Sequence, residues 1–308
     1  MNSPVRRRHA FSAVAGICAV LLLSACGNSP GSASGGSAPA GSTPVSVVAS
    51  TNVYGDIAEQ IGGDKVKITS IISDPAQDPH SYEADTQNQL ELSKAKIVIE
   101  NGGGYDDFID TMLKTTKNPS AEVLNVVKIS GKTPPAGEGL NEHVWYDLPT
   151  IQKLADQLAR SLSKVDPSGS ARFTQNATAF KAKLQPLQAK AAAVRSAKTG
   201  TAVAITEPVP GYLLQACGLV DKTPEEFSEA VEEGNDVSPK VLRDTLALFT
   251  GKQVKALVYN AQTGGPETQK LEQAAKSNGV AIVPVTETLP NGKDYLTWMT
   301  DNLNALQA

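Results

Sequence analysis

The chain has 308 residues, of which 40% are hydrophobic, and its 28 Lys and Arg against 32 Asp and Glu give a formal net charge of -4. This length and composition allow two domains with cores of their own and argue against wholesale disorder. No block of Lys or Arg follows residue 8, so the clustered cations that neutralise phosphates are missing and we expect no nucleic-acid partner. Three cysteines are too few for a dense disulfide framework, and three histidines leave a short list of candidates for imidazole chemistry.

The N-terminus has the pattern of an export signal. Three arginines at 6–8 precede an apolar stretch at 13–23, which is long enough for a signal peptide and too short to span a bilayer. The stretch ends in Leu-Ser-Ala-Cys-Gly, which resembles the lipobox of bacterial lipoproteins, and the resemblance implies lipid attachment at Cys26. The alternative is a plain secretory signal with a chance cysteine. We therefore expect a lipoprotein signal peptide at 1–25, a flexible Gly/Ser/Pro tether at 26–44, and an extracytoplasmic protein held at the cell membrane by its lipid.

Strands and helices alternate from Val45 onward. The pattern predicts strands at 46–50, 66–72, 97–100 and 123–126, and helices at 53–61, 86–94, 106–114 and from 147 or 150 to 162. Short apolar strands alternating with amphipathic helices favour a parallel sheet covered on both faces. We expect an N-terminal α/β lobe over 45–166.

A longer helix is predicted next, over 167–199. It is rich in Ala, Lys and Gln and has few apolar positions, so we expect a largely exposed strut, and Pro186 should kink it. The alternation then resumes, with strands at 202–206, 254–259 and 280–285 and helices at 210–217, 239–249, 267–277 and 294–306. The predicted fold class is therefore α/β, with two lobes, each a mostly parallel sheet flanked by helices, bridged by a single long α-helix, the second lobe spanning 200–308.

Two histidines remain after the signal, and both fall in loops of the first lobe. His80 lies in Asp-Pro-His-Ser-Tyr-Glu, just beyond the predicted strand at 66–72, and His143 lies in Glu-His-Val-Trp, which leads into a helix. The carboxyl ends of strands in open α/β sheets are where ligands bind. An ordinary structural role for each histidine stays open, and the chain has no HExxH, CxxC pair or GxSxG motif that would favour a zinc hydrolase or a structural zinc site.

These segments are similar to those of the bacterial metal-binding lipoproteins that serve ABC importers of zinc and manganese. The loops around His80 and His143 resemble the two segments of that family that each supply one imidazole. Glu207, followed by Gly-Tyr-Leu, matches the motif whose first residue is the third ligand, and Glu287 in Thr-Glu-Thr is similar to the stretch whose acid is the fourth. The resemblance implies metal binding by His80, His143, Glu207 and Glu287.

Three features depart from that family's pattern. Pro210 stands where Phe is usual, and Glu287 replaces the commoner Asp, so Asp301 or a water is the alternative fourth ligand. Residues 131–140, where many zinc-dedicated relatives carry a His-rich loop, hold no histidine.

Charge supports this ligand set independently. Two neutral imidazoles and two carboxylates balance a divalent ion in a cleft where an uncompensated charge would be costly. Imidazole suits Zn, Fe, Cu and Ni, and carboxylate suits Mn, so the donor set alone accepts several first-row metals. The resemblance implies Zn2+ or Mn2+, and Fe stays open. A ligating histidine needs an acceptor for its other ring N–H, and Asp147 is our candidate for His143.

Several other residues have a simpler interpretation. The acidic run at 225–236 is expected to be a solvated face, although it could attract cations or contact the permease. Cys217, Trp145 and Trp298 are expected in the core.

The sequence therefore predicts a non-enzymatic, monomeric receptor that binds a divalent metal and docks on the membrane subunits of an ABC permease. A zinc-dependent hydrolase would need an open coordination position and a nearby base. An adhesin or an organic-solute receptor on the same scaffold is the third possibility, and it would act without a metal. We expect small lobe rotation on metal binding, because a stiff helix joins the lobes.

Overall fold

A computed structural model describes residues 43–74, 77, 82–83, 85–134 and 139–308 of the chain. The predicted signal peptide, nearly all of the tether, Cys26 and His80 lie outside these residues. Residues 42–308 form one compact unit, so both predicted lobes belong to the same folded body.

The first lobe is built on a four-stranded, all-parallel sheet with the strand order β2-β1-β3-β4. Its elements are β1 (Val45–Thr51), α1 (Asn52–Gly62), β2 (Val66–Ile72), α2 (Thr86–Lys94), β3 (Ile97–Glu100), α3 (Asp107–Thr116), β4 (Glu122–Asn125), α4 (Val126–Ser130) and α5 (Leu148–Val165). The short helical turn Val144–Tyr146 precedes α5. Asp85 caps α2, because its carboxylate accepts the Asn88 N–H.

The second lobe repeats this arrangement with the strand order β6-β5-β7-β8, again all parallel. Its elements are β5 (Ala202–Ile205), α7 (Gly211–Ala216), β6 (Val220–Asp221), α8 (Glu225–Glu232), α9 (Pro239–Thr250), β7 (Ala256–Asn260), α10 (Pro266–Ser277), β8 (Ala281–Val285) and α11 (Tyr295–Gln307). The two-residue strand β6 and the helix α8 were not predicted. The predicted fold class, two parallel-sheet lobes bridged by a long helix, is confirmed.

Each central strand contributes to cores on both faces of its sheet, because successive side chains point in opposite directions. In β1, Val47 and Ala49 join the core shared with α1 and α5, whereas Val48 packs under α2 and α3. In β5, Val203 and Ile205 alternate in the same way with Ala204. Burial on both faces explains why the strands are continuous apolar runs.

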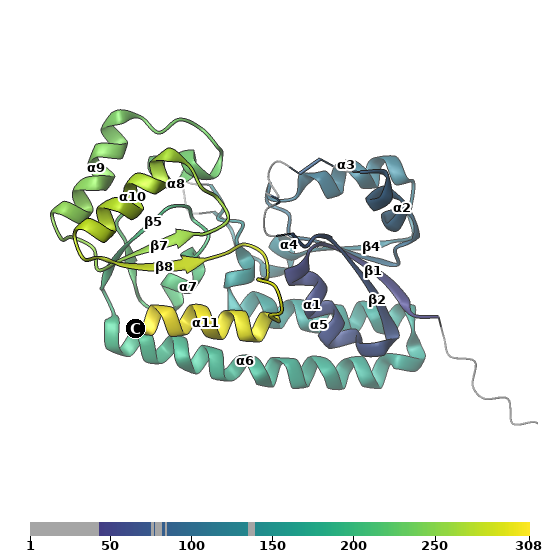
Figure 1. Cartoon of the computed structure of the whole chain (residues 1–308). Helices are drawn as coiled ribbons and strands as arrows, with labels where there is room; N and C mark the ends of the chain where they lie inside the picture. Colours follow the sequence, from purple (N-terminus) through teal and green to yellow (C-terminus); the bar gives the residue numbers. More distant parts are fainter. Residues whose placement is uncertain (1–42, 75–76, 78–81, 84, 135–138) are drawn as a thin grey trace, which may run out of the picture. The chain divides into compact units, whose positions relative to one another are not determined.

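The long helix α6 (Ser170–Lys198) continues through Pro186 as a single α-helix. Most of its surface is open to solvent, as expected, but a stripe of side chains is buried along its whole length: Phe173, Ala177, Phe180, Leu184, Leu187, Ala191 and Val194. Their spacing of four and three residues keeps them on one side of the helix. This stripe packs against α1 and α5 of the first lobe and α11 of the second (Figure 1). The helix is therefore part of one core that runs through both lobes.

Buried hydrogen bonds also join the lobes. The Tyr295 hydroxyl donates to the Trp145 carbonyl over 2.7 Å, and the Tyr146 hydroxyl donates to the Thr286 carbonyl over 2.7 Å. Within the described part of the chain, no helix is both long enough and apolar enough to cross a membrane.

Candidate metal site

His143 is fully buried at the start of the turn that leads into α5. Its backbone N–H and its ring Nδ1 both lie within hydrogen-bond distance of Asn141 Oδ1, at 3.0 and 2.9 Å. The Asn141 amide group donates in turn to the Pro208 carbonyl over 2.9 Å, which identifies Oδ1 as the acceptor. This network places a proton on Nδ1, so in the neutral imidazole the lone pair is on Nε2.

The acceptor that orients His143 is therefore Asn141, and the prediction of Asp147 was wrong. The Asp147 carboxylate instead caps α5, accepting from the Thr150 N–H over 3.0 Å, and pairs with Lys132 over 3.2 Å. Both residues are polar and both flank His143, so only the path of the loop distinguishes them.

The second lobe holds Asn141 in place. The Tyr212 hydroxyl donates to the Asn141 carbonyl over 2.6 Å. A Cβ atom on Gly211, the first residue of α7, would lie 2.7 Å from Asn141 Nδ2, so a side chain there would displace the amide. The orientation of the His143 imidazole thus depends on Gly211 and Tyr212, at the start of α7 in the second lobe.

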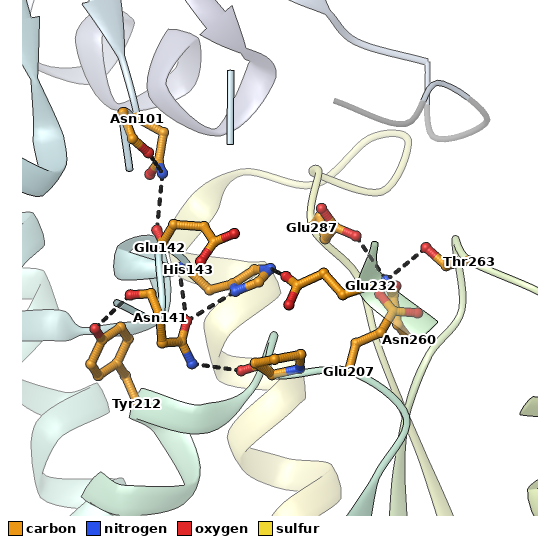
Figure 2. Close-up of polar contacts among 12 residues, drawn as sticks. Asn101, Asn141, Glu142, His143, Glu207, Tyr212, Glu232, Asn260, Thr263 and Glu287 are labelled. Carbon is orange, nitrogen blue, oxygen red and sulfur yellow. Dashed lines mark hydrogen bonds and ion pairs between the residues drawn. The ribbon is translucent and has the colours of Figure 1, made fainter. Parts of the chain in front are cut away.

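The lone pair of His143 faces a carboxylate that the sequence did not single out. Glu232, the last residue of α8, places Oε1 3.1 Å from His143 Nε2 (Figure 2). Glu142 adds a third group, since ligand atoms of Glu142, His143 and Glu232 all lie within 4.8 Å of one another. Among the described residues this is the one such group of possible metal ligands. It includes the predicted His143 but neither Glu207 nor Glu287.

Those two acids lie at the carboxyl ends of β5 and β8 and are joined by a shared donor. Asn260 Nδ2, at the end of β7, is 2.6 Å from Glu207 Oε2 and 2.8 Å from Glu287 Oε1 (Figure 2). Glu207 and Glu287 are 2% and 5% exposed. One amide therefore positions both buried carboxylates.

Electrostatic interactions connect the two groups of acids. Burial, together with the nearby charges of Glu142, Glu207 and Glu287, raises the pKa of the Glu232 carboxyl to about 9. Burial likewise raises the pKa of Glu142 to about 7, with a contribution from Glu287. Such mutual repulsion is relieved when a cation binds among the carboxylates.

Aromatic rings form the wall behind His143. Its ring centroid lies 5.0 Å from that of Trp145 and 6.0 Å from that of Tyr105, and both of these side chains are buried. Trp298 and Cys217 are also buried, so these residues belong to the core as predicted. Apolar walls lower the local dielectric constant and strengthen every charge interaction in the site.

A cavity of about 1340 Å³ opens beside this wall and is lined by both lobes, with Glu142 and Glu232 among its lining residues. An ion therefore has a route to the carboxylates. An imidazole lone pair and several carboxylates suit a divalent cation. Glu142 and His143 lie in the loop before the turn at 144–146, and Glu232 is at the end of α8.

Fold and site together define a class of protein: a two-lobed α/β binding protein whose polar residues gather where the strands of both sheets end. Residues 47–308 match the family described as "Zinc-uptake complex component A periplasmic". The match covers most of the chain, and the chain belongs to this family.

Relatives and solved structures agree with this assignment. The chain is 26% identical to the manganese-binding lipoprotein MntA of Bacillus subtilis over 77% of either chain. It is 25% identical to the iron ABC transporter substrate-binding lipoprotein MtsA of Streptococcus pyogenes serotype M1, over 93% of this chain and 94% of the relative. The periplasmic zinc-binding protein TroA of Treponema pallidum has the same fold, with a TM-score of 0.73 and 18% identity over 86% of this chain and 98% of that one.

Proposed function

We propose that this chain is an extracytoplasmic receptor that binds a divalent transition metal, Zn2+ or Mn2+, and delivers it to an ABC importer. The observation that carries the proposal is the orientation of His143: Asn141 occupies Nδ1, and the Nε2 lone pair points at carboxylates in a buried site. A buried array of acids without a cation would be costly, whereas a divalent ion would compensate their charge. The names of MntA, MtsA and TroA, which specify manganese, iron and zinc, support the same function.

The proposed protein ligands are His80, His143, Glu207 and Glu287. The shared bond to Asn260 supports Glu207 and Glu287 as a pair. Glu287 is a better candidate than Asp301, because Asp301 is paired with Lys293 and its side chain is 45% exposed. His80 lies outside the described residues and follows β2 in the sequence.

The family to which the chain belongs is named for an uptake component, and we propose that this member is not an enzyme. Four protein ligands would complete a tetrahedral zinc site, whereas a catalytic zinc keeps one position open for water or substrate. The metal is then cargo that is bound and released unchanged.

We further propose that the protein is anchored through a lipid on Cys26 and docks on the membrane subunits of its permease. A diacylglyceryl group provides two chains, which is enough for stable attachment where one chain is not. A single copy should suffice, because both lobes of one chain supply the site. The Cys26→Ser variant should move from the membrane fraction to the soluble fraction.

Metal titration of the purified, chelator-treated protein tests the central proposal. Elemental analysis before this treatment should find zinc or manganese, and Glu207→Ala should weaken binding by about tenfold or more while the apo protein keeps its circular dichroism spectrum. Glu226→Ala is the matched control, because Glu226 is an exposed acid on α8. Unchanged affinity in Glu207→Ala would contradict the ligand assignment, and a wild-type protein that binds no metal would favour the organic-solute alternative.

A further inference from the structure

Glu232 occupies a position that works against stability. It is the last residue of α8, where the negative end of the helix dipole disfavours a carboxylate. Its side chain is only 11% exposed, and Glu142, Glu207 and Glu287 lie close enough to repel it. Buried like charges at an unfavourable helix end are expected where a function requires them.

The end of α8 fixes the residue in this place. The Asn235 N–H donates to the Ala230 carbonyl over 2.7 Å, and Gly234 has a φ of +66°, which reverses the chain directly after the helix. Glu225, Glu226 and Glu229 on the same helix are exposed. Of the acids on α8, Glu232 alone is directed at His143 (Figure 2).

Two electron-rich atoms meet where Glu232 contacts His143. The Nδ1 atom of His143 bonds to Asn141, and its Nε2 atom lies 3.1 Å from Oε1 of Glu232. Two such atoms come this close only with a proton or a metal ion between them. A metal ion that binds both atoms would displace the proton.

We propose that Glu232 is an additional carboxylate ligand, which binds the same metal ion as His143 and biases the site toward an oxygen-preferring divalent ion, Mn2+ over Zn2+. The inference rests on the proposed function and extends its ligand set to a helix that the four-residue prediction does not include. Manganese accepts more ligands than the four of a tetrahedral zinc site, so an additional carboxylate suits it better. A third carboxylate also raises the share of oxygen donors, which manganese prefers.

The competing interpretation is that Glu232 contacts His143 only in the metal-free protein and is displaced when the metal binds. The two interpretations predict opposite signs for removal of the carboxylate. A ligand contributes to binding, so Glu232→Ala should weaken metal affinity. A side chain that must be displaced competes with the metal, so in that case Glu232→Ala should increase metal affinity.

The experiment measures Mn2+ and Zn2+ affinities of the full-length protein by competition with a chelator of known affinity. We expect Glu232→Ala and the isosteric Glu232→Gln to lose about tenfold or more in Mn2+ affinity, with a smaller loss for Zn2+. Electron paramagnetic resonance of the bound Mn2+ should change in both variants, because the ligand set changes. Glu229→Gln, an exposed acid one turn earlier on the same helix, is the matched control and should behave as wild type.

An unchanged or increased Mn2+ affinity in both variants would overturn the proposal, as would equal losses for the two ions. Thermal melting of the apo variants separates misfolding from lost coordination, and Glu232→Gln retains the shape of the side chain if Glu232→Ala fails to fold. The proposed function is tested separately by the wild type and by Glu207→Ala. If those bind as expected and Glu232 proves dispensable, only this inference fails.

Discussion

Asn260 is the residue through which the two acids of the second lobe are positioned. Its side-chain amide donates to both carboxylates, so Asn260→Leu should leave each of them without a shared orienting donor. We expect metal affinity to fall by about 10- to 100-fold, which is the usual effect of removing a residue that orients a ligand. Isothermal titration of the apo protein with Mn2+ or Zn2+ measures this.

The control for this prediction is Thr263→Val. Thr263 Oγ1 also contacts the Asn260 amide, at 3.1 Å, yet the substitution leaves both bonds from Asn260 to the carboxylates in place. It should therefore keep near wild-type affinity. If Asn260→Leu bound metal as tightly as Thr263→Val, the shared amide would have no role in positioning the acids.

The sequence identified His143, Glu207 and Glu287 through local motifs, and the structure adds residues that no local motif reveals. Asn260 ends a buried strand, and a polar residue at that place is a usable signal, although the predicted strand stopped at Tyr259. Glu232 belongs to an acidic run whose other helical acids are exposed, as predicted. Its direction toward His143 depends on how α8 packs in the second lobe, which is a tertiary property.

At the scale of the elements, α6 has the composition of an exposed helix, yet one continuous stripe of its side chains is buried. Pro186 lies on the exposed side of this helix, between the buried Leu184 and Leu187. A proline inside a helix removes one backbone hydrogen bond and crowds the preceding turn. Pro186→Ala should therefore stabilise the protein by about 1–2 kcal/mol, after allowing for the greater freedom of the unfolded chain.

Urea denaturation of the metal-free protein measures this change in the free energy of unfolding. Gln185→Ala is the control, because Gln185 is the exposed neighbour and its replacement leaves the backbone hydrogen bonds unchanged. A loss of stability in Pro186→Ala would mean that the packing of α6 depends on the shape that the proline imposes.

Elements with strong periodicity were predictable, and those that were missed, α4, β6 and α8, are short or have an ambiguous sequence pattern. The strand β6 has only two residues, which is too short for any alternation to appear. The helix α8 begins after Pro224 with two acids in its first turn, which is a recognisable start signal, but its charge favoured the interpretation as a solvated face. In α6 the buried residues recur every four and three positions. Two of them, Ala177 and Ala191, are small, so the sequence shows few large apolar residues on this side of the helix.

At the scale of the molecule, one core and several buried hydrogen bonds join the lobes. We therefore expect little rotation of one lobe against the other when metal binds. Double electron–electron resonance between spin labels at Lys114→Cys on α3 and Gln269→Cys on α10, both exposed positions, should give the same distance distribution with and without metal. The native Cys217 should resist labelling, because burial raises the pKa of its thiol to about 11.

A distribution that shifts as a whole to shorter distances on metal addition would show hinge closure and contradict this expectation. A pair of labels within the first lobe, at Lys114→Cys and Lys67→Cys, reports whether a shift arises inside that lobe instead. Both of these positions are exposed.

The acids of the apo protein make its stability depend on pH in a defined direction. Burial raises the pKa values of Asp56, Glu100 and Asp106, and it raises those of Glu142 and Glu232 to about 7 and about 9. Between the carboxyl pKa of an unfolded chain, about 4, and these raised values, the folded state binds more protons than the unfolded state. The free energy of unfolding should therefore fall as the pH rises from about 5 to about 9.

Metal should reverse this trend, because a bound cation displaces protons from its ligands and stabilises the folded state more as the pH rises. Denaturation series at pH 5 to 9, with a chelator and with saturating Mn2+, measure both slopes. The double variant Glu142→Gln, Glu232→Gln should show a shallower slope without metal, because two carboxyls with raised pKa values no longer titrate. An apo protein that gained stability toward pH 9 would mean that these carboxyls are charged without cost in the folded state. The repulsion from which we infer a cation site would then be absent.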